Sequence, residues 1–170
     1  LAMRCGQPST AAGVQEALAA GADRALALPL YPQWANATTK SSLVELRRLW
    51  PREKPLAEVC TWHDHEGYLN ASAAALGETL AKVDPALRDR VLVVFSAHGL
   101  PMSQVRAGDP YPVYVEHSSR ETARRAGVAT WQITYQSKVG PAKWLGPDTV
   151  EYLGAHAKGR VVVTVPIAFV

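Results

Sequence analysis

A histidine follows a run of five apolar residues in the middle of the chain. Residues 91–98 read VLVVFSAH, and the run from Val91 to Phe95 predicts a strand that is buried on both faces. Gly99 and Pro101 then predict a turn, so we expect His98 just past the carboxyl end of a core strand. Ligands of open parallel sheets bind at such strand ends. An imidazole there can accept a proton near neutral pH or bind a metal ion, whereas a lone histidine more often only steadies its turn.

A second group of candidate ligands surrounds His63 and His65, which flank Asp64 and precede Glu66. Two histidines at positions i and i+2 after a strand can face one metal ion, as in metal-dependent hydrolases. Because this spacing arises easily by chance, we favour the alternative that both residues only open the following helix. The sequence contains no Gly-rich phosphate loop and no G-x-S-x-G nucleophile elbow. Ser96 can orient the His98 ring, but nothing marks it as a nucleophile.

Short strands and helices alternate about ten times along the chain. The predicted strands cover residues 24–28, 56–61, 91–95, 131–135 and 160–165. The predicted helices begin at Thr10, at Thr38 or Thr39, at Gly67, within residues 108–112 and at Pro147. This alternation is typical of an α/β protein with parallel sheets covered by helices, in which the strand ends share one rim of each sheet.

The segments that follow these strands carry aromatic, amide and basic side chains. The residues concerned are Tyr31, Gln33, Trp34, Gln136, Lys138 and Trp144. Such a lining suits a large, flat, apolar ligand with anionic arms. Ordinary core aromatics on connecting loops would give the same composition, so from these residues alone both interpretations stay open.

Composition and charge narrow the class of protein. The 170 residues are 48% hydrophobic and 19% charged, as in globular domains. The basic residues behind the net charge of +3 are scattered along the chain, which argues against nucleic-acid binding. The charge favours binding to anionic membrane surfaces or to carboxylate-bearing substrates only weakly. No stretch approaches the roughly 20 apolar residues of a membrane span. Cys5 and Cys60 lack metal or redox spacing and are typical of a reducing compartment.

Seven segments together resemble the ferrochelatase family, in that family's order and spacing, over nearly the whole chain. They are MRCGQP (3–8), LPLYPQWANATTKSS (28–42), SAHGLP (96–101), GDPYP (108–112), YQSKVGP (135–141), WLGP (144–147) and VPIAF (165–169). Four residues depart from the family's usual pattern. Cys5 stands where the family usually has Tyr, and Gln7 stands where Asn is common. Trp34 replaces an aromatic residue that is usually Tyr or Phe, and Lys40 replaces a common Gly.

The resemblance implies a fold of two Rossmann-like domains with a porphyrin in the cleft between them. We expect residues 1–66 to form the C-terminal portion of the first domain, and residues 67–170 to form the crossover helix and most of the second. We also expect a fragment that is incomplete at both ends. The family carries a His and a Glu after the VPIAF segment, and the sequence ends at Val170 before them. By itself the chain is therefore expected to be inactive.

The implied activity is insertion of Fe²⁺ into protoporphyrin IX or coproporphyrin III during haem synthesis. Fe²⁺ is then a substrate, and no tightly bound cofactor is expected. By position in the motifs, His98 matches the metal ligand and proton acceptor, while Arg4, Tyr31, Ser42 and Trp144 match the porphyrin-binding segments. The implied location is the cytoplasm, as for the bacterial members of the family. Peripheral attachment to the inner membrane is compatible with this expectation. A chelatase for another metal and a non-catalytic porphyrin or haem carrier are the alternatives.

Overall fold

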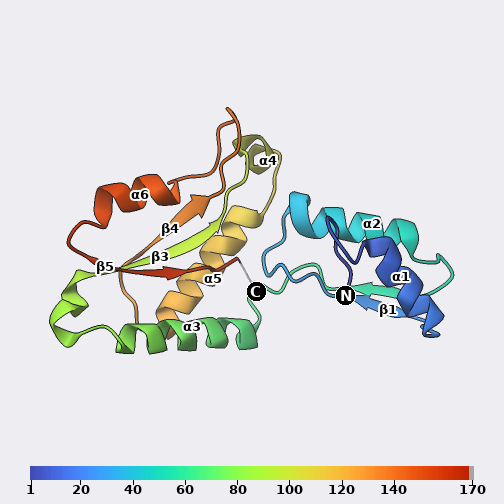
Figure 1. The fold of residues 1–170 in the computed structure, drawn as a ribbon, viewed down its shortest axis with the longest axis horizontal. Coiled ribbons are helices and arrows are strands. Elements are labelled where there is room, and N and C mark those ends of the chain that lie inside the picture. The colour runs from blue at the N-terminus through green and yellow to red at the C-terminus, as the bar shows by residue number, and fades with distance from the viewer. Residues whose placement is uncertain (169–170) are drawn as a thin grey trace. The chain divides into compact units, whose positions relative to one another are not determined.

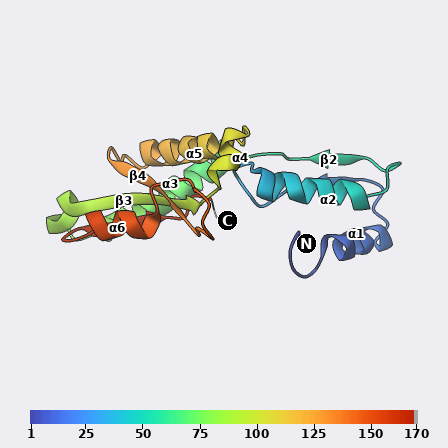
Figure 2. The same cartoon turned by 90° about the horizontal axis from the view of Figure 1, so that it is seen from above.

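The computed structural model describes residues 1–168 and contains two compact units, which divide between Trp62 and His63. Figures 1 and 2 show that each unit combines helices with strands. We call residues 1–62 the N-terminal unit and the described residues from His63 onward the C-terminal unit. The sequence predicted a division after residue 66 instead, and the assignment of these parts to a first and a second domain of the family stays a prediction. Phe169, which ends the VPIAF segment, lies outside the described residues.

The N-terminal unit contains a two-stranded parallel sheet and its covering helices. Its elements are α1 (Thr10–Ala19), β1 (Ala25–Ala27), the π-helical turn η1 (Asn36–Lys40), α2 (Ser41–Leu49) and β2 (Leu56–Glu58). In the ladder Ala25 lies opposite Leu56, and Ala27 lies opposite Glu58. Helices α1 and α2 pack on each other and bury Val14 and Leu43. The strands are thus shorter than predicted, but their pairing is parallel as expected.

The first turns of these two helices are stabilised in different ways. Ser9, not Thr10, caps α1, because its Oγ accepts a hydrogen bond from the Ala12 N–H over 3.2 Å. The Thr10 hydroxyl instead donates to the Met3 carbonyl. Helix α2 has no side-chain cap, since it continues directly from η1, and Thr38 and Thr39 already lie inside that turn. Helix α2 therefore begins at Ser41, later than the predicted start at Thr38 or Thr39.

The C-terminal unit is built on a three-stranded parallel sheet. Its elements are α3 (Glu66–Ala81), η2 (Pro85–Arg90), β3 (Val91–His98), α4 (Met102–Arg106), α5 (Tyr111–Arg125), β4 (Trp131–Gln136), α6 (Thr149–His156) and β5 (Val161–Val165). The strand order is β4-β3-β5, so β3 is central. The connection through α5 runs from β3 to β4, and the connection through α6 runs back from β4 past β3 to β5. Because right-handed crossovers in opposite directions across a sheet place their helices on opposite faces, α5 and α6 lie on the two sides of the sheet, as Figure 2 shows. Helix α3 packs beside α5.

The central strand forms the core of this unit. Every residue from Leu92 to Ala97 is buried, and the Phe95 ring meets Trp131 edge-on at a centroid distance of 5.5 Å. This confirms the prediction of a strand buried on both faces, although β3 also includes His98. The short helix α4 was not predicted. The fold class, parallel sheets covered by helices, is confirmed. Within residues 1–168, the helices are all too short or too polar to cross a bilayer.

Replacing the central core side chain tests this account of the sheet. Phe95 is 0% exposed, so Phe95→Ala is expected to lower the free energy of unfolding by about 3–5 kcal/mol through lost burial and a residual cavity. Denaturant unfolding of the full-length protein measures this loss. Val113→Ala, at a position on α5 that is 65% exposed, is the control and should change stability little. Similar losses for the two variants would contradict the account.

Candidate functional site at the carboxyl end of β3

His98 is the last residue of the central strand and the first exposed one after six buried residues. It lies opposite Gln136, the last residue of β4. The next N–H, that of Gly99, donates to the Gln136 carbonyl over 2.8 Å, so the two strands end side by side. The ladder therefore fixes the backbone of His98 while leaving its imidazole accessible to solvent.

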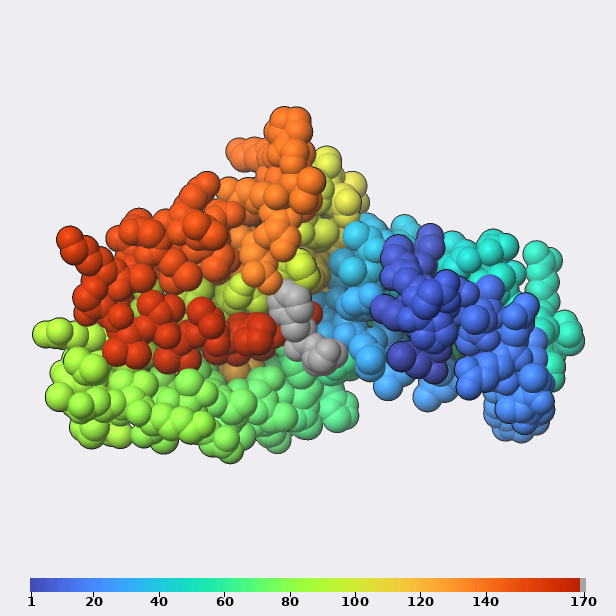
Figure 3. All heavy atoms as spheres, viewed as in Figure 1, coloured from blue at the N-terminus to red at the C-terminus, as the bar shows by residue number. Residues whose placement is uncertain are grey.

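The loop that carries Trp144 pairs with the turn after His98. The Met102 N–H donates to the Lys143 carbonyl over 2.8 Å, and the Leu145 N–H donates to the Leu100 carbonyl over 2.9 Å. The indole itself lies against Gly99, because a Cβ added there would come within 3.2 Å of Trp144 Cε3. In Figure 3 this loop, in orange, stands out from the surface beside α4. The structure thus brings His98 and Trp144 together, as two sides of one rim.

Lys138 anchors the same loop to helix α6. Its ammonium group lies 3.1 Å from Glu151 Oε1 and 3.4 Å from Asp148 Oδ2. Asp148 also caps α6 by accepting hydrogen bonds from the Val150 and Glu151 N–H groups, and these bonds together with Lys138 lower the pKa of its carboxyl group. Of the two interpretations left open for Lys138, these ion pairs favour a structural role, because its side chain is engaged with α6.

Two buried tyrosines lie in this unit close to the strand ends, and the sequence did not single them out. Tyr111 begins α5, and Tyr135 lies near the end of β4. Burial is the main cause that raises the pKa of both hydroxyls, that of Tyr135 to about 12. Both phenols are therefore neutral near pH 7. The only signal for Tyr111 was its place in the GDPYP segment, within which the sequence predicts the start of a helix.

Arg4, Tyr31 and Ser42, the other predicted site residues, all belong to the N-terminal unit. Arg4 is exposed on a loop closed by the hydrogen bond from the Met3 N–H to the Pro8 carbonyl. It lies close enough to Glu45 to contribute to that residue's lowered pKa, after the larger effect of Arg48. Because Glu45 is one helical turn beyond Ser42 on α2, Arg4 is near the part of α2 that carries Ser42.

Tyr31 is exposed on the segment that connects β1 with η1. This segment is held from the end of β2, since the Thr61 hydroxyl donates to the Pro32 carbonyl and the Trp62 indole N–H donates to the Pro29 carbonyl, both over 2.9 Å. Gln33 on the same segment is only 2% exposed. For Gln33 this burial favours the second of the two interpretations, an ordinary buried residue on a connecting segment, whereas Tyr31 is exposed.

His63 and His65 have structural roles at the start of α3. His65 Nδ1 accepts a hydrogen bond from the Gly67 N–H over 3.2 Å and so caps the helix. The His63 ring stacks on Tyr114 at 4.0 Å and meets His117 edge-on at 5.2 Å. No group of three or more metal-binding side chains occurs within the described part of the chain. This arrangement supports the interpretation that the two histidines open the helix.

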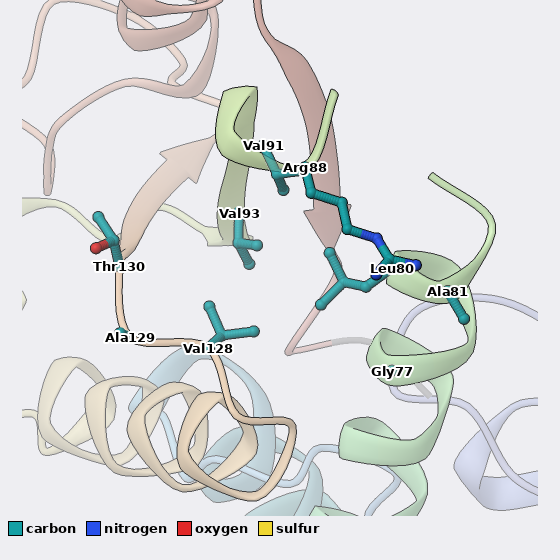
Figure 4. Close-up of a pocket in the computed structure, with 9 residues that line it drawn as sticks. All are labelled: Gly77, Leu80, Ala81, Arg88, Val91, Val93, Val128, Ala129 and Thr130. Carbon is teal, nitrogen blue, oxygen red and sulfur yellow. The ribbon is translucent and has the colours of Figure 1, made fainter. Parts of the chain in front are cut away.

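A cavity of about 480 Å³ lies at the opposite end of the sheet (Figure 4). Its walls come from the end of α3, from the amino end of β3 at Val91 and Val93, and from Val128 to Thr130 ahead of β4. Arg88 extends across it toward Leu80. Because ligands of parallel sheets bind at the carboxyl ends of strands, the candidate site is the rim at His98 and not this cavity.

Comparison with known proteins gives one consistent family. A family model described as Ferrochelatase matches residues 1–170. Ferrochelatase of Synechococcus sp. (strain RCC307) is 39% identical, over 100% of this chain and 46% of the relative. Ferrochelatase of Geotalea uraniireducens (strain Rf4) is 37% identical, over 100% of this chain and 54% of the relative. Mitochondrial ferrochelatase of Schizosaccharomyces pombe is 38% identical, over 99% of this chain and 42% of the relative. The chain thus spans about half the length of the curated relatives it matches.

The contact between Gly99 and Trp144 can be tested by adding one methyl group. In Gly99→Ala the new Cβ would lie 3.1 Å from the Gln136 carbonyl oxygen and 3.2 Å from the indole. The carbonyl belongs to the ladder and cannot easily yield, so the Trp144 loop is expected to shift at a cost of about 1–3 kcal/mol. Trp144 fluorescence and denaturant unfolding measure the change, and Gly77→Ala, with open space around its Cα, is the control. An unchanged indole environment in Gly99→Ala would contradict the contact.

The partly buried ring of His63 predicts a pH-dependent stability. Burial holds the pKa of His63 below its usual 6.5, His117 adds to this effect, and Asp64 opposes it. Below the usual pKa the unfolded chain therefore binds more protons than the folded chain, so stability falls as the pH drops. His63→Phe keeps the stack on Tyr114 but cannot titrate. Its unfolding midpoint in denaturant should fall less than that of the wild type between about pH 7 and about pH 5. Equal losses would refute this role of His63.

Proposed function

This chain belongs to the ferrochelatase family, and we propose that its protein inserts Fe²⁺ into a porphyrin, protoporphyrin IX or coproporphyrin III, in haem biosynthesis. The observation that carries the proposal is the position of His98. It is an exposed imidazole at the carboxyl end of a buried central strand, with Trp144 on the neighbouring loop of the same rim. Both residues lie in segments that match the family.

The reaction needs a base and a metal-binding group at one place. As Fe²⁺ enters the macrocycle, two pyrrole N–H protons must leave, so the porphyrin loses two protons and gains one dication. A neutral imidazole can accept such a proton or bind Fe²⁺ before transfer. His98 offers both functions, because its backbone is fixed by the ladder with Gln136 while its ring is exposed. No tightly bound cofactor enters this scheme, and Fe²⁺ is a substrate.

The remaining predicted residues suit the other parts of a porphyrin. The indole of Trp144 offers an apolar surface to the macrocycle beside His98. In the N-terminal unit, Arg4 can pair with a propionate carboxylate, and the Ser42 hydroxyl and the exposed Tyr31 can contact the same arm or the ring edge. We propose that these residues bind porphyrin, while His98 acts on the protons and the metal.

Substituting His98 in the full-length protein tests the proposal. Because His98→Ala removes the base and the metal ligand but leaves the apolar contacts, Fe²⁺ insertion should fall by at least about 100-fold while porphyrin binding persists. Insertion is followed by absorbance with protoporphyrin IX and with coproporphyrin III, and binding by fluorescence. The control is His156→Ala, at an exposed histidine on α6.

The outcomes separate the alternatives. Full activity in His98→Ala would remove His98 from the mechanism. A wild-type protein that binds porphyrin without inserting any metal would be a carrier. Insertion of another divalent metal in preference to Fe²⁺ would indicate a chelatase of different specificity.

A further inference from the structure

The loop between β4 and α6 is held by backbone pairing at its two ends but not along its first half. Backbone hydrogen bonds fix Gln136 at one end and Leu145 at the other. The residues between them from 137 to 143 are all exposed. Within the part of the chain that the structure describes, residues 137–142 make no hydrogen bond from backbone to backbone. A polar anchor of this half of the loop therefore has to involve a side chain.

The side chain of Lys138 is that anchor. Its ammonium group lies 3.1 Å from Glu151 Oε1 and 3.4 Å from Asp148 Oδ2, so it pairs with two carboxylates at the amino end of α6. Both partners are themselves fixed, because Asp148 caps the helix and Glu151 lies in its first turn. Among the described residues, 137–143 form no ion pair other than those of Lys138.

The backbone beside Lys138 is strained. Ser137 has a φ of 67°, in the left-handed region that favours glycine. A residue with a side chain keeps such a conformation only where its surroundings hold it. The neighbours of Ser137 are Gln136, which is fixed in the ladder, and Lys138, which is fixed to α6. Loss of the ion pairs removes one of these two constraints, and the strain then favours a shift of the loop.

Trp144 is the side chain that depends on this anchor. Its indole N–H donates to the Val139 carbonyl over 3.2 Å, and Val139 directly follows Lys138. The indole also lies against Gly99, at the end of β3. The position of the ring is therefore set by the strand end on one hand and by the segment that Lys138 fixes on the other.

We propose that Lys138 is a positioning residue for porphyrin binding, which acts through Trp144 and does not contact the porphyrin. This inference rests on the proposed function, in which the Trp144 indole offers an apolar surface to the macrocycle. The competing role for a lysine beside such a site is direct pairing with an anionic arm of the ligand. The ammonium group of Lys138 is already engaged by two carboxylates of its own chain, which favours the positioning role.

Lys138→Met, which removes the charge but keeps the length of the side chain, tests the role of Lys138 in the full-length protein. Because exposed ion pairs are individually weak, we expect the porphyrin KM to rise about three- to fivefold. We expect kcat for Fe²⁺ insertion to stay within about twofold, because the indole shifts while His98 keeps its place in the ladder. Lys138→Arg retains the charge and should restore KM to within about twofold of the wild type.

Glu151→Gln separates positioning from direct binding, because it removes a partner of Lys138 and leaves the loop itself unchanged. We expect KM to rise by about twofold or more, a smaller change than in Lys138→Met since Asp148 still pairs with the lysine. The double variant should show no greater rise than Lys138→Met alone, because both substitutions act on one interaction. If Lys138 instead bound the porphyrin directly, loss of the competing Glu151 carboxylate would leave KM unchanged or lower it.

The Trp144 indole N–H gives a readout that does not depend on activity. Selective ¹⁵N-tryptophan labelling makes it visible by NMR, and its absence in Trp144→Phe assigns the signal. We expect this signal to move in Lys138→Met and in Glu151→Gln, because the hydrogen bond to the Val139 carbonyl is altered. Lys158→Met, which removes an exposed lysine charge beyond the end of α6, is the matched control and should change neither the signal nor KM.

Two results would overturn the inference. One is an unchanged KM in Lys138→Met, and the other is a rise in KM that Glu151→Gln does not share. If the full-length protein inserts no Fe²⁺, its porphyrin affinity measured by fluorescence takes the place of KM in the same comparison. The proposed activity would then fail, while the role of Lys138 would be decided separately by the affinities and the indole signal.

Discussion

The parallel ladder on both sides of β3 is the constraint on which the C-terminal unit depends. Every residue from Leu92 to Ala97 is enclosed between β4, β5 and the helices on the two faces, so none of them can reach a ligand. His98 is the first residue of the strand that leaves this enclosure while its backbone is still paired with Gln136. A rigid backbone and an accessible ring are what a proton acceptor and metal ligand requires.

The segments around His98 depend on this strand end in turn. The turn after His98 contains a glycine against which the Trp144 indole packs, and the backbone of the Trp144 loop bonds that of the turn. Lys138 ties the same loop to the amino end of α6 through Asp148 and Glu151. The aromatic surface and the imidazole are therefore set by one connected system of backbone pairing, ion pairs and close packing.

Much of this architecture could be predicted from the sequence, because the signals are local. The apolar run that became β3 and the helical spacing of apolar residues that became α3 are visible in the sequence itself. Helix α4 was missed because five residues, Met102 to Arg106, are too few to show a period. The cap of α2 was mistaken because a π-helical turn precedes it, and no sequence pattern marks such a turn. His98 was found from its place after an apolar run, whereas Tyr111 and Tyr135 are buried by tertiary packing that only the fold reveals.

The most direct test of the central claim is a crystal structure of the full-length protein with a bound metalloporphyrin. The account predicts that the metal either lies within about 3 Å of a His98 ring nitrogen or is joined to that nitrogen by one bridging water, with Trp144 beside the macrocycle. A metalloporphyrin bound away from the carboxyl end of β3, for instance at the cavity beside Arg88, would contradict it.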